Sequence, residues 1–374
     1  MTGSVPLFEI DWDHHEIRNA VDSICRGSYW AKGPYVEEFE NRLEAYYDVN
    51  HAVVVNSGTT ALVGALTALG VGPGDAVVVP SFTFIATANA VRLVGATPVF
   101  ADIDRETYGL DPADVERKIT PDTEAILPVH PYGSACRIDE LVSLARDHDV
   151  SLVEDAAEAF GCEYDGQLLG TFGEAAALSF CQNKVVTTGE GGAVITDDPK
   201  IADAARLYRS HGRSSEGYFE RTDSGTYTTL GTNVRMSDLV ASIGCAQMEK
   251  ADELIAGRRR VAAQYDEALR GVPDVAPHPY PALSKHVYQL YTVELAETVD
   301  RAALVKVLDD HGVSCKVYWD PPVHRTEFYG ANVSLAVTDE VASRVLTLPM
   351  HPNLSVKEVE RVVSALEVGI EKAK

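Results

Sequence analysis

The chain has 374 residues, of which 45% are hydrophobic and 24% charged, as is usual for a globular protein with a large buried core. Its 56 acidic and 32 basic residues give a formal net charge of −24, which makes nucleic acid and anionic membranes unfavourable partners. So acidic a surface would suit a salt-rich cytoplasm, where screening removes self-repulsion. The alternative to this halophilic interpretation is an acidic protein without salt adaptation.

The first residues, from Met1 to Asp11, contain neither a basic leader nor an apolar signal core. No apolar run approaches the roughly 18 residues of a membrane helix. We therefore expect a cytoplasmic protein that does not insert into membranes. The six cysteines lie far apart and form no C-x-x-C pair, which favours reduced thiols over disulfides or a zinc site. His14 and His15 are neighbours, but the sequence places no third ligand, so we predict no metal site.

Short β-branched runs alternate with helical stretches from about residue 50. We predict strands at residues 52–55, 76–79, 98–100, 125–129, 151–153, 175–180 and 193–196, and helices at 59–69, 84–94, 111–119 and 138–148. Continuous apolar strands separated by helices indicate a mostly parallel sheet covered on both faces. The sequence therefore predicts an α/β fold for this part of the chain.

The pattern changes after Ser237. One long helix, or two in succession, is predicted to about Leu269, followed by a strand at 288–295, a helix at 301–311, a strand at 313–317 and an amphipathic helix at 356–372. We expect a large domain at residues 1–250 and a smaller α+β domain at 251–374. The N-terminal segment could pack against the smaller domain.

Three segments of the large domain fit one site. The first is Asn56-Ser57-Gly58-Thr59-Thr60, which joins a strand to a helix start and offers hydroxyls, a glycine and free amides for a phosphate. A plain capped helix start is the alternative, and the segment is neither a Walker loop nor a dinucleotide fingerprint. In the second segment, Asp155 ends an apolar strand. It could cap a helix, or it could face a pyridine nitrogen and keep that nitrogen protonated.

Lys184 is in the third segment, between a strand and the glycine-rich turn Gly189-Glu190-Gly191-Gly192. A lone loop lysine is normally solvated. Next to a phosphate and a pyridinium its pKa would fall, which would make the amine nucleophilic near neutral pH. Each segment alone is weak evidence for a ligand site. Only the presence of all three, in this order along the chain, indicates a shared ligand.

These segments resemble the DegT/StrS-type sugar-nucleotide aminotransferases, a branch of the fold-type I enzymes that use pyridoxal 5'-phosphate. The matching stretches are residues 56–62, 80–89, 154–158, 179–184, 189–192 and 233–238. The resemblance implies a large domain with a mostly parallel sheet flanked by helices, and a smaller C-terminal α+β domain. It also implies that Lys184 holds the cofactor as a Schiff base and moves a proton, while Asp155 pairs with the pyridinium.

Further roles follow from the same resemblance. Glu158 corresponds to the position that contacts the phenolic oxygen of the cofactor, and Phe84 to the aromatic side chain stacked on its ring. Asn233 matches a residue that reaches the phosphate from the neighbouring subunit, which implies a homodimer with shared active sites. The resemblance assigns the phosphate to Ser57, Gly58, Thr59 and Ser179.

Dehydratases of this family carry His where this chain has Lys184, so the lysine favours amino transfer. Glu158, together with Asn183-Lys184, resembles the perosamine-synthase branch, which aminates C4 of nucleotide-linked 4-keto-6-deoxy sugars. The expected reaction moves an amino group from L-glutamate to such a sugar for glycan or polysaccharide synthesis. A sugar dehydratase, a C3 aminotransferase and a non-catalytic regulator remain alternatives. Residues 321–329 follow the family's substrate-side loop only loosely. His324 there could contact substrate, but we expect it to be a surface residue.

Overall fold

The apolar strands assemble into one seven-stranded sheet with the order β1-β9-β8-β5-β4-β2-β3. The computed structural model describes residues 3–214 and 225–374. The strands are β1 (His51–Val55), β2 (Ala76–Pro80), β3 (Thr97–Ala101), β4 (Thr123–Ile126), β5 (Ser151–Asp155), β8 (Ala175–Ser179) and β9 (Gly192–Thr196). Only β9 runs antiparallel to its two neighbours, and the remaining pairs are parallel. The predicted mostly parallel α/β sheet is confirmed.

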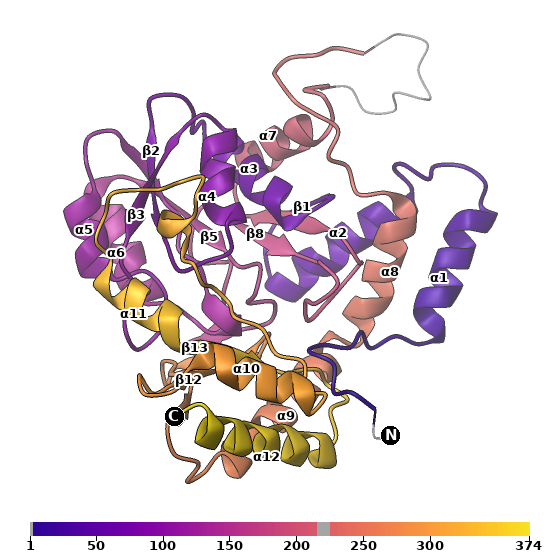
Figure 1. The fold of residues 1–374 in the computed structure, drawn as a ribbon. Helices are drawn as coiled ribbons and strands as arrows, with labels where there is room; N and C mark the ends of the chain where they lie inside the picture. The colour runs from indigo at the N-terminus through magenta and orange to yellow at the C-terminus, as the bar shows by residue number, and fades with distance from the viewer. Residues whose placement is uncertain (1–2, 215–224) are drawn as a thin grey trace.

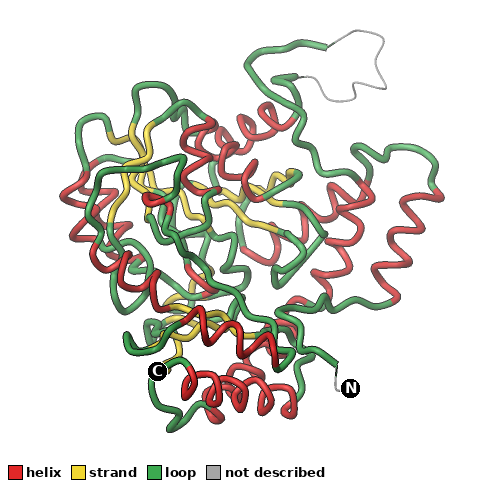
Figure 2. The backbone as a smooth tube through the Cα atoms, viewed as in Figure 1, coloured by secondary structure: helices red, strands yellow, loops and turns green. Residues whose placement is uncertain are grey.

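Helices cover both faces of this sheet (Figures 1 and 2). Because side chains alternate along a strand, Val53 and Val55 of β1 pack into one core, and Ala52 and Val54 into the other. The first core is completed by α3 (Gly58–Ala68), α4 (Ala86–Leu93) and α7 (Pro199–Arg209). The second is completed by α2 (Pro34–Tyr47), α5 (Pro112–Lys118), α6 (Ile138–His148) and α8 (Asp238–Glu249).

Local signals account for several helix boundaries. Asp111 caps α5 through the amide of Ala113, and Pro112 occupies the first turn. The helix predicted at residues 84–94 is shorter, because α4 begins only at Ala86. The long helical stretch after Ser237 is two helices in succession, α8 and α9 (Ala251–Ala268).

The C-terminal part has its own apolar core. It is built on a three-stranded sheet of β10 (Val275–Pro277), β12 (Tyr291–Leu295) and β13 (Val345–Leu348), with α9, α10 (Arg301–Asp310), α11 (Ala336–Arg344) and α12 (Val356–Lys372) nearby. Val5 pairs with Val313, so the N-terminal segment contacts this part. The strand predicted at 313–317 is wrong, because only isolated bridges occur there. The domain boundary at residues 250 and 251 stays a prediction.

The remaining elements are small or peripheral. The strands β6 (Glu163–Tyr164), β7 (Gln167–Leu168) and β11 (Ser284–Lys285) form a second three-stranded sheet. The helix α1 (His14–Cys25) packs on α8 at one side of the molecule. Among residues 3–214 and 225–374, no helix is long and apolar enough to cross a membrane.

Candidate active site

The three predicted segments meet at the carboxyl edge of the central sheet. Asp155 and Ser179 are the last residues of the neighbouring parallel strands β5 and β8, and Asp155 pairs with Ala177. Gly192, at the start of β9, pairs with both Ser179 and Val55, which brings the end of β1 to the same edge. Open α/β sheets bind ligands at this edge, because the loops that leave the strands converge there.

Asp155 is a buried carboxylate whose hydrogen-bond partners are all neutral. One oxygen accepts from Thr87 Oγ1 at 2.8 Å and the other from the amide of Ala157 at 3.2 Å. Burial raises the pKa of Asp155, although Thr87 and the nearby Lys184 oppose that rise. Within the described parts of the chain, no basic side chain lies within ion-pair distance of this carboxylate. Asp155 therefore lacks a cation of its own.

Lys184 lies across the site from Asp155 and contacts another acid. Its Nζ is 3.4 Å from Oε1 of Glu158, and both side chains are largely buried. The second oxygen of Glu158 accepts from the amide of Tyr132 at 2.9 Å. Glu158 is thereby fixed from the other side, and the lysine amine is held inside the site.

The segment 56–60 forms a cradle at the start of α3. Ser57 is the N-cap and accepts from the amide of Thr60, which leaves the amides of Gly58 and Thr59 without an intrahelical acceptor. A Cβ atom at Gly58 would lie 2.8 Å from Cβ of Ser179, so the helix start and the end of β8 are in close contact. The free amides, the helix dipole and the neighbouring serine suit a phosphate.

Two further predicted residues lie at the surface. Phe84 is 59% exposed, although it lies between Thr83 and Thr87, whose hydroxyls are 2.8 Å apart and lead to Asp155. The Phe84 side chain is therefore not packed into the core, and its two threonine neighbours in this segment lead to the buried acid. Asn233 is exposed too, in a segment that bridges to Ser210.

The structure adds residues to which the sequence analysis assigned no role. Thr87 belongs to a recognised segment, but nothing in the sequence distinguishes it from its neighbours. Tyr132 stacks on Trp319 with ring centroids 5.5 Å apart, and its hydroxyl donates to the carbonyl of Tyr318. Burial, together with the charge of Glu158, raises the pKa of Tyr318. These aromatic residues bring the 318–319 segment to the site.

The expectation that His324 is a surface residue is wrong, because this side chain is fully buried. Its Nδ1 lies 2.6 Å from Oγ of Ser81, and its amide donates to the same oxygen at 2.9 Å. Ser81 directly follows β2, so His324 fastens the substrate-side loop to the sheet edge. The buried partner of His324 is Ser81, which is distant in the sequence, so the residues around His324 gave no sign of its burial.

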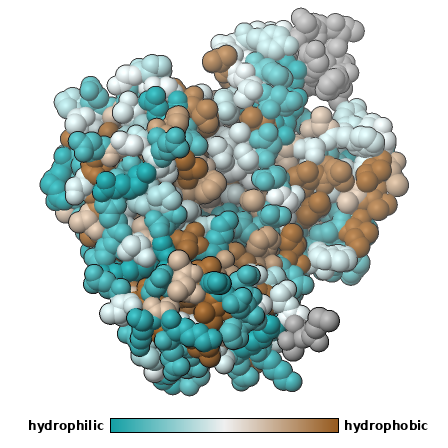
Figure 3. All heavy atoms as spheres, in the orientation of Figure 1, coloured by the Kyte–Doolittle hydropathy of each residue, from teal (hydrophilic) through white to brown (hydrophobic). Residues whose placement is uncertain are grey.

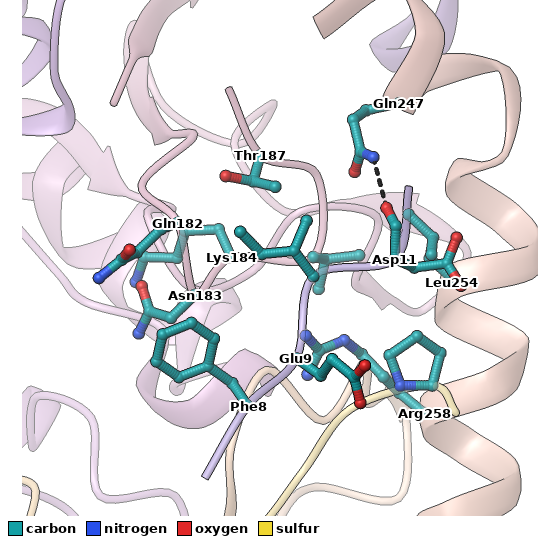
Figure 4. A pocket seen from close by; sticks show the side chains of 13 residues that line it. Phe8, Glu9, Asp11, Gln182, Asn183, Lys184, Thr187, Gln247, Leu254 and Arg258 are labelled. Atoms are coloured by element: carbon teal, nitrogen blue, oxygen red, sulfur yellow. Dashed lines mark hydrogen bonds between the residues drawn. The ribbon is translucent and has the colours of Figure 1, made fainter. Parts of the chain in front are cut away.

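Figure 4 shows a small pocket at the loop that carries Lys184. Lys184 and Asn183 line it together with Glu9 of the N-terminal segment and Arg258 of α9. Asp155 does not line this pocket, so it is separate from the place where the lysine and the acids meet.

His14 and His15 do have a third neighbour. Asp13 joins them in a partly exposed group whose potential ligand atoms lie within 4.8 Å of one another. Asp13 is already engaged as the N-cap of α1, where its side chain accepts from the amide of His15 at 2.6 Å. The group is accounted for by helix capping.

Comparisons with known proteins give a consistent result. The profile of the DegT/DnrJ/EryC1/StrS aminotransferase family matches residues 12–367. The chain is 39% identical over 350 residues to the GDP-perosamine synthase of Caulobacter vibrioides, with 92% of each chain covered. It is 36% identical to the dTDP-3-amino-3,4,6-trideoxy-alpha-D-glucose transaminase of Streptomyces venezuelae, over 99% of this chain and 97% of that protein.

Solved structures of other proteins are similar to this chain over nearly its full length. DesV of S. venezuelae, determined in complex with a ketimine intermediate, superposes with a TM-score of 0.91 at 35% identity and full coverage of both chains. The sugar aminotransferase Spr1654 of Streptococcus pneumoniae, described as putative and in its PMP form, gives a TM-score of 0.91 at 27% identity, with 99% and 98% of the two chains covered. The similarity therefore includes the whole fold and the edge that carries the site.

Proposed function

The chain belongs to the DegT/DnrJ/EryC1/StrS aminotransferase family, and we propose that it uses pyridoxal phosphate to move an amino group from L-glutamate to C4 of a nucleotide-linked keto-deoxy sugar. The observation that carries the proposal is the buried Asp155 carboxylate, which has only neutral hydrogen-bond partners and lies near Lys184. A buried acid without a cation is costly, and a protonated pyridine nitrogen would supply the missing charge.

The residues at the sheet edge fit the cofactor. The family depends on pyridoxal phosphate, and one solved relative is described in the PMP form. The free amides of Gly58 and Thr59, with Ser57 and Ser179 beside them, would hold the phosphate. Phe84 is exposed, in the segment whose Thr87 donates to Asp155, and its ring would stack on the pyridine ring. Lys184 would hold the cofactor covalently, and Glu158 would face its phenolic oxygen.

The bound cofactor supplies an electron sink for the carbanion formed at the substrate. The chain's own residues would do the rest. Asp155, kept dry by burial, favours a protonated ring nitrogen. The Lys184 amine would carry the proton at the reacting carbon, and Glu158 would limit its movement. Burial of both side chains keeps bulk water from competing for that proton.

The nature of the acceptor is supported by the relatives. GDP-perosamine synthases are 32–39% identical to this chain, and together with Glu158 and Asn183-Lys184 they favour C4 amination. Amination at C3 is the second candidate, because a transaminase named for a 3-amino sugar is 36% identical. Both reactions lead towards amino sugars for glycan or polysaccharide synthesis.

The test uses purified protein, L-glutamate and paired nucleotide-linked sugars with a keto group at C3 or at C4. We expect 2-oxoglutarate release, and an amino group at C4 by NMR of the product, only with the 4-keto sugar. The Lys184→Ala variant should lose the visible absorbance of the bound cofactor and all turnover. An absorbance band that survives in this variant would refute the cofactor assignment, and a 3-amino product would establish the second candidate.

A second copy of the chain is the proposed partner, and α1 supports this. The helix packs a polar stripe of Glu16, Asn19 and Ser23 onto α8 and exposes an apolar stripe of Ile17, Val21 and Ile24. This is the reverse of a normal surface helix. Brown atoms gather over α1 in Figure 3, and the exposed aromatic side chains of Trp12, Tyr29 and Trp30 extend this area.

An exposed apolar area of this kind suits a protein interface, and the net charge of −24 makes nucleic acid and anionic membrane unfavourable occupants. In a homodimer, Asn233 would reach the phosphate of the neighbouring subunit. Sedimentation should give a dimer for the wild type and a monomer for Ile17→Glu with Val21→Glu. A folded wild-type monomer with full activity would refute the shared site.

A further inference from the structure

The peptide that joins Asn183 to Lys184 is held at both of its polar ends. Its N–H, on Lys184, donates to the carbonyl of Cys181 at 2.9 Å. Its carbonyl, on Asn183, accepts from Nε2 of Gln289 at 2.7 Å. Rotation of the peptide plane would break these two hydrogen bonds, so together they favour one direction in which the lysine side chain leaves the backbone.

Gln289 is itself rigidly placed. It is only 2% exposed, in the segment that leads into β12. Its own carbonyl accepts from the guanidinium of Arg258 at 3.2 Å. A Cβ atom at Gly133 would lie 2.9 Å from the amide nitrogen of Gln289, so the backbone on the other side is also in close contact. The amide group therefore reaches Asn183 from a fixed support.

The same segment also holds the other end of the lysine. The amide of Leu290 donates to the carbonyl of Tyr132 at 3.2 Å, and the amide of Tyr132 donates to Glu158 at 2.9 Å. Glu158 in turn contacts Nζ of Lys184 at 3.4 Å. The segment 289–290 thus connects, in a closed ring of contacts, to both the backbone and the amine of Lys184.

We propose that Gln289 is a positioning residue for Lys184. Its amide fixes the lysine backbone while the neighbouring peptide, acting through Tyr132 and Glu158, fixes the amine, so that the C-terminal part of the chain aligns the lysine. The inference rests on the proposed role of Lys184. In the described parts of the chain, the Gln289 side chain makes no hydrogen bond to Asp155 or Glu158, and it reaches the lysine through the main chain of Asn183.

The first test is the rate at which cofactor-free protein takes up pyridoxal phosphate, followed by stopped-flow absorbance. Gln289→Leu removes the donor and should slow uptake by about tenfold, the equivalent of ~1.4 kcal/mol. The rate constant kcat should fall by ~10–100-fold with little change in KM for the sugar, because a misplaced reacting group affects mainly the chemical step.

Gln289→Glu separates alignment from stability. A carboxylate would repel the carbonyl of Asn183, whereas the protonated acid can donate to it again. Uptake by this variant should recover relative to wild type as pH falls from about 8 towards about 5, since burial raises the pKa of a carboxyl group. A loss of packing alone would give no such recovery.

Gln247→Leu is the matched control. Gln247 is also 2% exposed, and its Nε2 donates to the carbonyl of Asp11 at 2.8 Å, as Figure 4 shows, and to Glu16. It makes no hydrogen bond to the lysine loop. Any effect of this variant should fall on stability, with uptake kinetics like those of the wild type.

The proposal is overturned if both Gln289 variants take up the cofactor at the wild-type rate, or if Gln247→Leu slows uptake as much as Gln289→Leu. If Gln289→Leu does not fold, the pH dependence of cofactor uptake by Gln289→Glu tests the proposal, and the absence of recovery at low pH overturns it. Failure of the proposed function would look different. In that case the wild type would show no cofactor band that depends on Lys184, and the Gln289 comparison would have no baseline signal.

Discussion

Glu154 is the buried acid next to Asp155, and its replacement by glutamine tests whether a carboxylate is needed behind the site. The side chain is fully buried. Oε1 accepts from the amides of Phe172 and Gly173 at 2.7 and 3.0 Å. Oε2 accepts from the amide of Gly170 at 2.7 Å and lies 3.0 Å from Nε2 of His130. Four donors therefore converge on one carboxylate.

Glutamine can satisfy only some of these donors. With its oxygen towards Phe172 and Gly173, its NH2 group faces the amide of Gly170, which is left unpaired. His130 must then accept at Nε2 and carry its proton on Nδ1. That nitrogen now accepts from the amide of Cys136 at 3.4 Å, so a second amide loses its partner. Two unpaired buried donors at about 1–3 kcal/mol each predict a destabilisation of about 2–6 kcal/mol for Glu154→Gln.

The assay is urea unfolding at neutral pH, followed by both tryptophan fluorescence and circular dichroism, with cofactor-free protein. Glu174→Gln is the control, because Glu174 is exposed and accepts one amide, that of Leu152, which a glutamine oxygen can also accept. We expect the control to change stability by less than about 0.5 kcal/mol. If Glu154→Gln were equally mild, the argument that the four donors require a carboxylate would be refuted.

Three further outcomes are expected. Asp155→Asn should stabilise the cofactor-free protein at neutral pH, because burial raises the pKa of Asp155 and its ionisation therefore costs stability. In urea unfolding, this gain should vanish as pH falls below about 4, where the aspartate is protonated in the unfolded chain as well. Gly58→Ala should weaken cofactor binding at least tenfold in a fluorescence titration, since its Cβ would lie 2.8 Å from that of Ser179, and unchanged affinity would count against the cradle. The free energy of unfolding should rise with KCl concentration if the charge of −24 reflects salt adaptation, and an optimum at low salt would exclude that interpretation.

Periodicity and local signals determined most of the central sheet. The β-branched runs at residues 52–55 and 76–79 are strands because their side chains can be buried on both faces, and the capped start at Asp111 is a helix start. The same reasoning failed at residues 313–317, where the apolar residues are present but their partners offer only isolated bridges. A strand needs a neighbour, and the sequence of one segment does not specify whether that neighbour is present.

For the site, the sequence by itself predicted which residues carry chemistry. A serine-glycine helix start, an acid at a strand end and a lysine before a glycine turn are local patterns, and their order along the chain indicates one family. Only the tertiary structure decided what supports them. Thr87 at Asp155, Tyr132 at Glu158 and Gln289 at Asn183 come from distant parts of the chain. Such contacts depend on how strands and loops pack, and a threonine or glutamine carries no local signal of the partner it will meet.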